Sequence, residues 1–178
     1  MKVVSVFGGS APKPGSAAYA ESLAMGRLLA RAGYTVATGG YTGVMEAASR
    51  GAAEAGGHVI GVTCGLIENW REGFGANAWV KEEIKFDTLR DRLYHLVSFC
   101  DAAVAMGGGI GTLSEVSLMW SLVQTGEIKR RPLVLVGPVW RETLREFLAQ
   151  ADGYVPERDR TLLRFANHVD HVVPLLTE

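Results

Sequence analysis

Hydrophobic residues form short unbroken runs that alternate with longer segments in which they recur every few positions. Short runs bounded by glycine or polar residues are typical of buried strands, and the longer spacing is typical of helices. The runs predict strands at Val3–Phe7, Tyr34–Thr38, His58–Thr63, Trp79–Phe86, Asp101–Met106 and Leu133–Val136. The spaced pattern predicts helices at Ser16–Arg31, Thr42–Ala55, Asp87–Phe99 and Thr112–Thr125, with an irregular, lid-like segment at Cys64–Ala78 and a helix and a short element after Val136.

Strands that alternate with helices predict an α/β fold of the Rossmann-like, doubly wound kind, with a mostly parallel sheet covered by helices on both faces. A chain of 178 residues with 48% hydrophobic content can bury one sizeable core, so we expect a single domain over residues 1–178. The segment Val116–Val123 is apolar on nearly every side. Such a helix is either central in the monomer or covered by a partner.

Charge and composition limit the classes of partner and the cellular setting that we expect for the chain. A net charge of −1 offers no general attraction to nucleic acid, and no apolar stretch approaches the roughly 18 residues of a membrane span. Cys64 and Cys100 form no C-x-x-C pair, and the N-terminus does not resemble a signal peptide, so we expect a reducing, cytoplasmic setting. His168 and His171 have a spacing that suits a metal but lack an evident third ligand, so we expect none.

Glycines cluster directly after the predicted strands, at Gly8–Ser10, Gly39–Gly43 and Gly107–Gly111. The carboxyl ends of parallel strands meet at one sheet edge, where free backbone N–H groups at helix starts attract anions and glycine lets a phosphate approach closely. Alternatively, these turns need glycine only for their backbone geometry. We expect a site for a phosphorylated small molecule. The predicted binding residues are Ser10, Gly39, Gly40, Gly43, Gly108, Gly109, Gly111 and Thr112.

Two standard phosphate motifs are missing from these loops. A Walker A loop needs a lysine and a hydroxyl residue after its last glycine, but Gly111 is followed by Thr112 and Leu113. A dinucleotide fingerprint needs G-x-G-x-x-G after the first strand and an acidic residue near the end of the second. Gly8–Ser10 and Tyr34–Thr38 supply neither, so the sequence predicts neither ATP hydrolysis nor dinucleotide binding.

Glu115 and Arg92 are the candidate reactive side chains. A carboxylate beside an anomeric carbon stabilises the positive charge of a breaking ribosyl bond and orients water. Glu115 also completes a T-x-x-E capping box with Thr112, which would give it a purely structural role. Arg92 falls at the margin of the apolar stripe of its predicted helix, where an arginine usually extends to a surface carboxylate such as Asp87 or Asp91.

Three segments together resemble the "lonely guy" family: Gly39–Met45, Arg92 ahead of Ser98–Ala102, and Gly108–Glu115. The resemblance implies a Rossmann-like fold, a homodimer or larger homo-oligomer, no cofactor, and a phosphoribohydrolase that cleaves nucleoside 5′-monophosphates, including cytokinin nucleotides, to free base and ribose 5-phosphate. It assigns Glu115 and Arg92 to the catalytic motif. An older label for the family, lysine decarboxylase, finds no support, because that chemistry uses pyridoxal phosphate on a lysine and no lysine here has such a setting.

Three positions depart from the family pattern: Gly107 replaces a proline, Leu93 a lysine and Glu46 a glycine. These departures leave two other functions open. One is a non-catalytic carrier of a nucleotide or of the molybdenum cofactor. The other is a DNA-binding domain like those of bacterial DNA-processing proteins, which the near-neutral charge disfavours.

Overall fold

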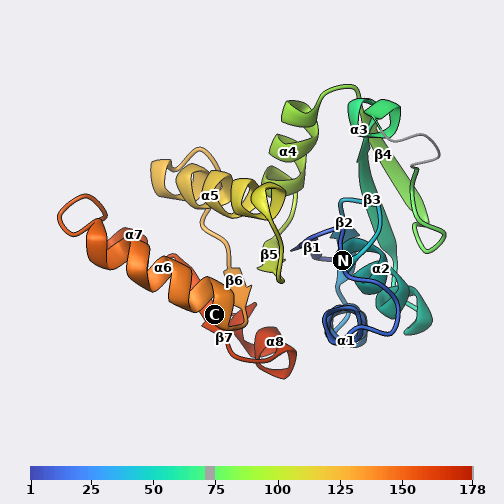
Figure 1. The fold of residues 1–178 in the computed structure, drawn as a ribbon, viewed down its shortest axis with the longest axis horizontal. Helices are drawn as coiled ribbons and strands as arrows, with labels where there is room; N and C mark the ends of the chain where they lie inside the picture. The colour runs from blue at the N-terminus through green and yellow to red at the C-terminus, as the bar shows by residue number, and fades with distance from the viewer. Residues whose placement is uncertain (71–74, 178) are drawn as a thin grey trace.

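The computed structural model describes residues 1–70 and 75–177, and its centre is a seven-stranded parallel sheet (Figure 1). The strands lie side by side in the order β4-β3-β2-β1-β5-β6-β7. Their bounds are β1 Val3–Phe7, β2 Thr35–Thr38, β3 Val59–Cys64, β4 Glu82–Phe86, β5 Ala102–Ala105, β6 Leu133–Val136 and β7 Leu163–Ala166. The predicted Rossmann-like α/β fold is thus confirmed.

Helices cover both faces of this sheet. One face packs against α1, α2 and the C-terminal α8, and the other against α4, α5 and α6. The helical bounds are α1 Ala17–Arg31, α2 Val44–Glu54, α3 Gly65–Trp70, α4 Leu89–Ser98, α5 Ile110–Thr125, α6 Pro138–Gln150, α7 Glu157–Arg160, η1 Val169–His171 and α8 Val172–Leu175. Each face therefore has its own apolar core.

Helices α1 and α2 approach each other so closely that their backbones touch. A Cβ atom added at Gly26 would lie 2.0 Å from the carbonyl oxygen of Ala48, and one added at Gly51 would lie 1.9 Å from that of Leu23. Only glycine fits at such a contact, and the pair of glycines fixes where the two helices cross. The start of α2 is held separately, because the N–H of Val44 donates to the carbonyl of Gly9, just after β1, at 2.9 Å.

The chain reverses its direction across the sheet at β1. From β1 it moves outward through β2, β3 and β4, then returns to add β5 on the other side of β1. The carboxyl ends of β1 and β5 therefore flank the switch point, where open α/β sheets bind their ligands. The two loops touch there, because the backbone N–H of Gly9 donates to the carbonyl of Gly107 at 3.0 Å.

Several predicted boundaries differ from the structure; helices α2 and α4, for example, each begin two residues later than predicted. Part of the irregular segment is the helix α3, whose six residues are too few to show a helical period, and residues 71–74 of that segment lie outside the described residues. Strand β4 begins at Glu82 rather than Trp79, because a turn precedes it in which the N–H of Val80 bonds to the carbonyl of Asn77 at 3.1 Å. Helix α5 begins at Ile110 rather than Thr112.

Helix α5 buries one apolar face within the chain, although Ile110 and Leu113 at its start are exposed. Val116, Met119 and Leu122 face the sheet, whereas Ser117 and Ser121 are exposed. The central position of this helix explains its apolar sequence, and the expected oligomer stays a prediction. In the part of the chain that the structure describes, every helix is too short or too polar to cross a membrane.

Candidate functional site

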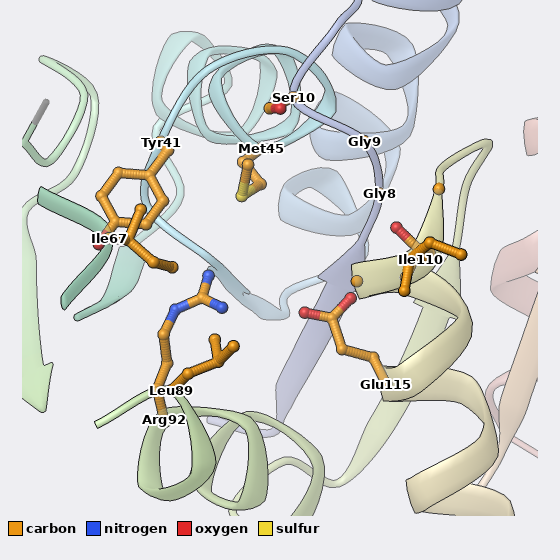
Figure 2. Close-up of a pocket in the computed structure, with 13 residues that line it drawn as sticks. Gly8, Gly9, Ser10, Tyr41, Met45, Ile67, Leu89, Arg92, Ile110 and Glu115 are labelled. Carbon is orange, nitrogen blue, oxygen red and sulfur yellow. The ribbon is translucent and has the colours of Figure 1, made fainter. Parts of the chain in front are cut away.

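A cavity of about 400 Å³ opens at the switch point between β1 and β5 (Figure 2). The loop after β1 and the start of α5 form one side, and side chains from α3, α4, the loop after β2 and the start of α2 form the other. The lining residues are Gly8, Gly9, Ser10, Tyr41, Met45, Ile67, Leu89, Arg92, Gly109, Ile110, Gly111, Thr112 and Glu115.

Arg92 turns inward from α4 and is only 6% exposed. Its Nε donates to the carbonyl of Val62 at 2.8 Å, and its Nη2 donates to the carbonyl of Gly39 at 3.1 Å. Its Cζ lies 5.5 Å from the centre of the Tyr41 ring, within range of a cation–π contact. Within the described residues no carboxylate lies within 4.0 Å of this guanidinium, so a buried positive charge faces the cavity. The alternative of an arginine paired at the surface is wrong.

Glu115 points into the cavity from the second turn of α5, opposite Arg92 (Figure 2). It is 8% exposed, and burial raises the pKa of its carboxyl to about 7, although the positive charge of Arg92 acts in the opposite direction. The capping-box interpretation is also wrong. The N-cap of α5 is Gly109, which makes no side-chain capping bond, and Thr112 lies inside the helix.

The backbone at the start of α5 is open to the cavity. A Cβ atom added at Gly107, Gly109 or Gly111 would meet nothing within 4 Å. The first intrahelical bond at this end runs from the N–H of Leu113 to the carbonyl of Gly109 at 3.0 Å. The preceding N–H groups of the first turn have no acceptor inside the helix, and they carry the positive end of its dipole. Ser10 lines the same side of the cavity.

Four glycines of the predicted binding set do not line the cavity. A Cβ atom added at Gly39 would lie 2.1 Å from Nη2 of Arg92, and one added at Gly40 would lie 2.8 Å from Cγ2 of Thr63. A Cβ atom added at Gly43 would lie 2.4 Å from the carbonyl oxygen of Gly9. At Gly108 the distance to Oγ1 of Thr112 would be 2.1 Å. These glycines make room for the protein's own atoms. Of the predicted set, the structure brings Ser10, Gly109, Gly111, Thr112, Arg92 and Glu115 together.

Sequence reasoning missed the apolar wall of the cavity, formed by Tyr41, Met45, Ile67 and Leu89. Leu89 lies one helical turn before Arg92, so its position could have been inferred from Arg92. Ile67 lies in a segment that shows no periodicity. The Tyr41 hydroxyl is already occupied, since it donates to the carbonyl of Cys64 at 3.1 Å and accepts from the N–H of Cys64 at 2.7 Å.

None of the three departures from the family pattern lines the cavity. Gly107 lies at the open loop, and Leu93 is half-buried on α4. Glu46 accepts a hydrogen bond from the Tyr19 hydroxyl at 3.2 Å, between α1 and α2. His168 and His171 pack edge to face at 5.9 Å, and no group of three metal-ligating side chains is found among residues 1–70 and 75–177.

The fold and the cavity define a Rossmann-like α/β protein with a pocket at its switch point that is lined by a buried arginine, a buried glutamate and the uncapped start of a helix. A profile of the SLOG cluster4 family matches residues 1–147, and the chain belongs to this family. It is also 31% identical over 154 residues to a probable cytokinin riboside 5′-monophosphate phosphoribohydrolase of Oryza sativa subsp. japonica, covering 85% of this chain and 66% of that protein. These matches confirm the resemblance seen in the sequence.

Solved structures with this fold include proteins of other functions. The molybdenum cofactor binding protein of Rippkaea orientalis is 25% identical, with a TM-score of 0.75 over 98% of this chain and 94% of that one. DNA processing protein A of Streptococcus pneumoniae is 14% identical, with a TM-score of 0.65 over 100% of this chain and 62% of that one. The second likeness concerns the fold alone.

Proposed function

We propose that this protein hydrolyses the N-glycosidic bond of a purine nucleoside 5′-monophosphate, releasing the free base and ribose 5-phosphate. The observation that carries the proposal is Glu115, a buried carboxyl that faces a cavity beside the start of a helix with no side-chain cap. The named activity of the rice relative, cleavage of a cytokinin riboside 5′-monophosphate, supports the same chemistry.

The 5′-phosphate would bind at the end of the cavity formed by Ser10 and Gly109–Thr112. Free N–H groups and a helix dipole favour a dianion there. The base would then lie toward Tyr41 and Ile67, which stand on the other side of Arg92 (Figure 2). This orientation places the ribose between the two ends, within reach of Glu115.

Hydrolysis needs negative charge near the anomeric carbon. As the bond from C1′ to the base breaks, its electron pair leaves on the base nitrogen, and positive charge builds on the ribose ring. The ionised carboxylate of Glu115 would stabilise that charge and orient a water molecule whose oxygen bonds to C1′. One water proton passes to Glu115 and from there to the departing base. A carboxyl with a pKa of about 7 can both accept and return this proton near neutral pH.

Arg92 would hold the substrate and keep a share of Glu115 ionised. Its positive charge lowers the pKa of Glu115 against the effect of burial. The carbonyls of Val62 and Gly39 already hold the guanidinium in place. Arg92 would therefore lose little side-chain entropy when the substrate binds.

Incubation with AMP, other nucleoside monophosphates and N6-substituted purine nucleotides tests the proposal. Chromatography should detect free base and ribose 5-phosphate in equal amounts. Glu115→Gln should lower kcat at least about 100-fold with little change in the binding of ribose 5-phosphate. Glu127→Gln, an exposed carboxyl just after α5, is the matched control and should behave as the wild type. Binding without release across the whole panel would refute hydrolysis.

A second candidate is a non-catalytic carrier of the molybdenum cofactor, a pterin that bears a phosphate. The structural likeness to the Rippkaea orientalis protein, which spans nearly the whole of both chains, favours it. On this proposal the protein would retain the cofactor through gel filtration, and Glu115→Gln would leave that retention unchanged. Rapid turnover of AMP with no retained cofactor would reject the carrier.

A further inference from the structure

A tight turn ahead of β4 is hydrogen-bonded to the loop that follows β2. The backbone N–H of Asn77 donates to the carbonyl of Gly40 at 2.7 Å. Its side-chain Nδ2 donates to the carbonyls of Gly40 at 2.9 Å and of Tyr41 at 3.0 Å. We propose that Asn77 is a positioning residue that fixes Arg92 in the cavity through this loop.

The orientation of the Asn77 amide is set by its own turn. Its Oδ1 accepts from the N–H of Trp79 at 3.1 Å, and its carbonyl accepts from the N–H of Val80 at 3.1 Å. The Nδ2 group is therefore the end that faces the loop. Val80 in turn packs on β3, since a Cβ atom added at Gly61 would lie 2.7 Å from its Cγ2. The turn is thus seated on the sheet.

The loop after β2 supplies two of the contacts that hold Arg92. The carbonyl of Gly39, one residue before Gly40, accepts from Nη2 of Arg92 at 3.1 Å. The ring of Tyr41 lies 5.5 Å from the Arg92 Cζ. Asn77 thus bonds to both residues that follow Gly39. A shift of this loop would remove an acceptor from a buried cation, which is a costly loss.

Arg92 packs closely against this loop. A Cβ atom added at Gly39 would lie 2.1 Å from its Nη2 and 2.6 Å from Sδ of Met45, so the side of the guanidinium next to the loop is filled, although its other side faces the cavity. A shift of the loop would therefore move the atoms that the guanidinium touches and displace it toward the cavity. This tight fit links a residue outside the cavity lining to the charge inside it.

A double-mutant cycle tests the link. Asn77→Ala should weaken ribose 5-phosphate and AMP binding about 5- to 20-fold by calorimetry, because two hydrogen bonds that place the loop are lost. In an Arg92→Ala background the same change should cost less than about twofold. Leu144→Ala, a buried change on α6, is the control for lost stability and should show no coupling with Arg92→Ala. Should Asn77→Ala fail to fold, Asn77→Asp keeps the acceptor for Trp79 and replaces only the donor.

The binding measurements in this test rest on the proposed function. A second measurement needs no ligand and therefore tests the role of Asn77 separately. The Arg92 Nε–H, bonded to the carbonyl of Val62, should give a protected arginine signal in nitrogen-15 NMR spectra. Asn77→Ala should shift or broaden that signal, and Leu144→Ala should not. A wild-type protein that binds neither ligand would refute the proposed function while the NMR result still decides the role of Asn77. An unmoved Arg92 signal, or equal losses of binding in both backgrounds, would overturn the role.

Discussion

The glycine loops at 39–43 and 107–111 look alike in sequence but do different work in the fold. Each follows a buried parallel strand and leads into a helix. In the first loop, Gly39 makes space for the Arg92 guanidinium and Gly43 for the backbone of Gly9. In the second, Gly109 and Gly111 face open space at the cavity. A glycine after a strand can therefore admit either a ligand or the protein itself, and the space around a hypothetical Cβ atom separates the two cases.

Substituting Gly39 gives the largest expected effect. In Gly39→Ala the new methyl group would overlap Nη2 of Arg92 and Sδ of Met45, and these flexible ends can move aside. The unfolding free energy should therefore fall by only about 1 kcal/mol, while kcat/KM for AMP falls about 100-fold because Arg92 loses its place. Steady-state kinetics and thermal melting measure the two quantities. Activity within threefold of wild type would contradict the role assigned to this loop.

Gly108 tests the one tightly packed position of the second loop. In Gly108→Ala the methyl group would lie 2.1 Å from Oγ1 of Thr112 and 3.0 Å from the backbone nitrogen of Gly9. Backbone cannot move as freely as a side-chain end, so we expect a loss of roughly 1–3 kcal/mol in unfolding free energy and about a tenfold loss of activity. Urea denaturation and AMP turnover would measure them. An unchanged denaturation midpoint would show that the loop at 107–111 does not pack tightly against Thr112 and Gly9.

The pH dependence of stability and of turnover tests the reactive role proposed for Glu115. Because the folded pKa is about 7 and the unfolded carboxyl ionises near 4.5, the folded state holds an extra proton between these values. Stability should therefore fall as pH rises from about 4.5 to 7 and then level off. Turnover, which needs the ionised form, should rise up to tenfold per pH unit below 7. Glu115→Gln should remove this component of the stability profile, and an identical profile would contradict the assignment.

Gly107 should give the smallest effect. A Cβ atom at this position meets nothing within 4 Å, and the residue is exposed. Gly107→Ala should therefore keep activity within about twofold and stability within about 0.5 kcal/mol. It is the matched control for Gly108→Ala, one residue away. A large loss in kcat/KM would show that this departure from the family pattern matters to catalysis after all.

The strand pattern was readable because burial on both faces produces unbroken apolar runs such as Val3–Phe7, which the structure reproduces as β1. The cavity was readable only in part. Arg92 could be singled out from the resemblance, but its acceptors at Val62 and Gly39 lie 30 and 53 residues away in sequence, so no local pattern shows that it turns inward. Asn77 gave no signal at all, because its role depends on contacts 36 and 37 residues away.

A glycine loop can also hide the true first residue of a helix from sequence analysis. The pair Thr112 and Glu115 matches a capping box, yet α5 begins at Ile110 because glycine at 109 allows the helix to extend into the loop. Hydroxyl caps are present elsewhere: Ser16 accepts from the N–H of Tyr19 at 3.2 Å, and Thr88 accepts from that of Asp91 at 3.1 Å. At the start of α5, by contrast, Gly109 stands where α1 and α4 have a hydroxyl cap.

On the proposed function, the uncapped start of α5 would tie the stability of this protein to the supply of its ligand. An anion at Gly109–Thr112 would satisfy N–H groups that no side-chain cap satisfies, and it would bind the folded chain alone. By mass action, a ligand at 100 times its Kd adds about 2.7 kcal/mol to the free energy of unfolding. Cells with abundant ligand would thus hold more of this protein against proteolysis than starved cells, and the amount of protein would itself report on the ligand.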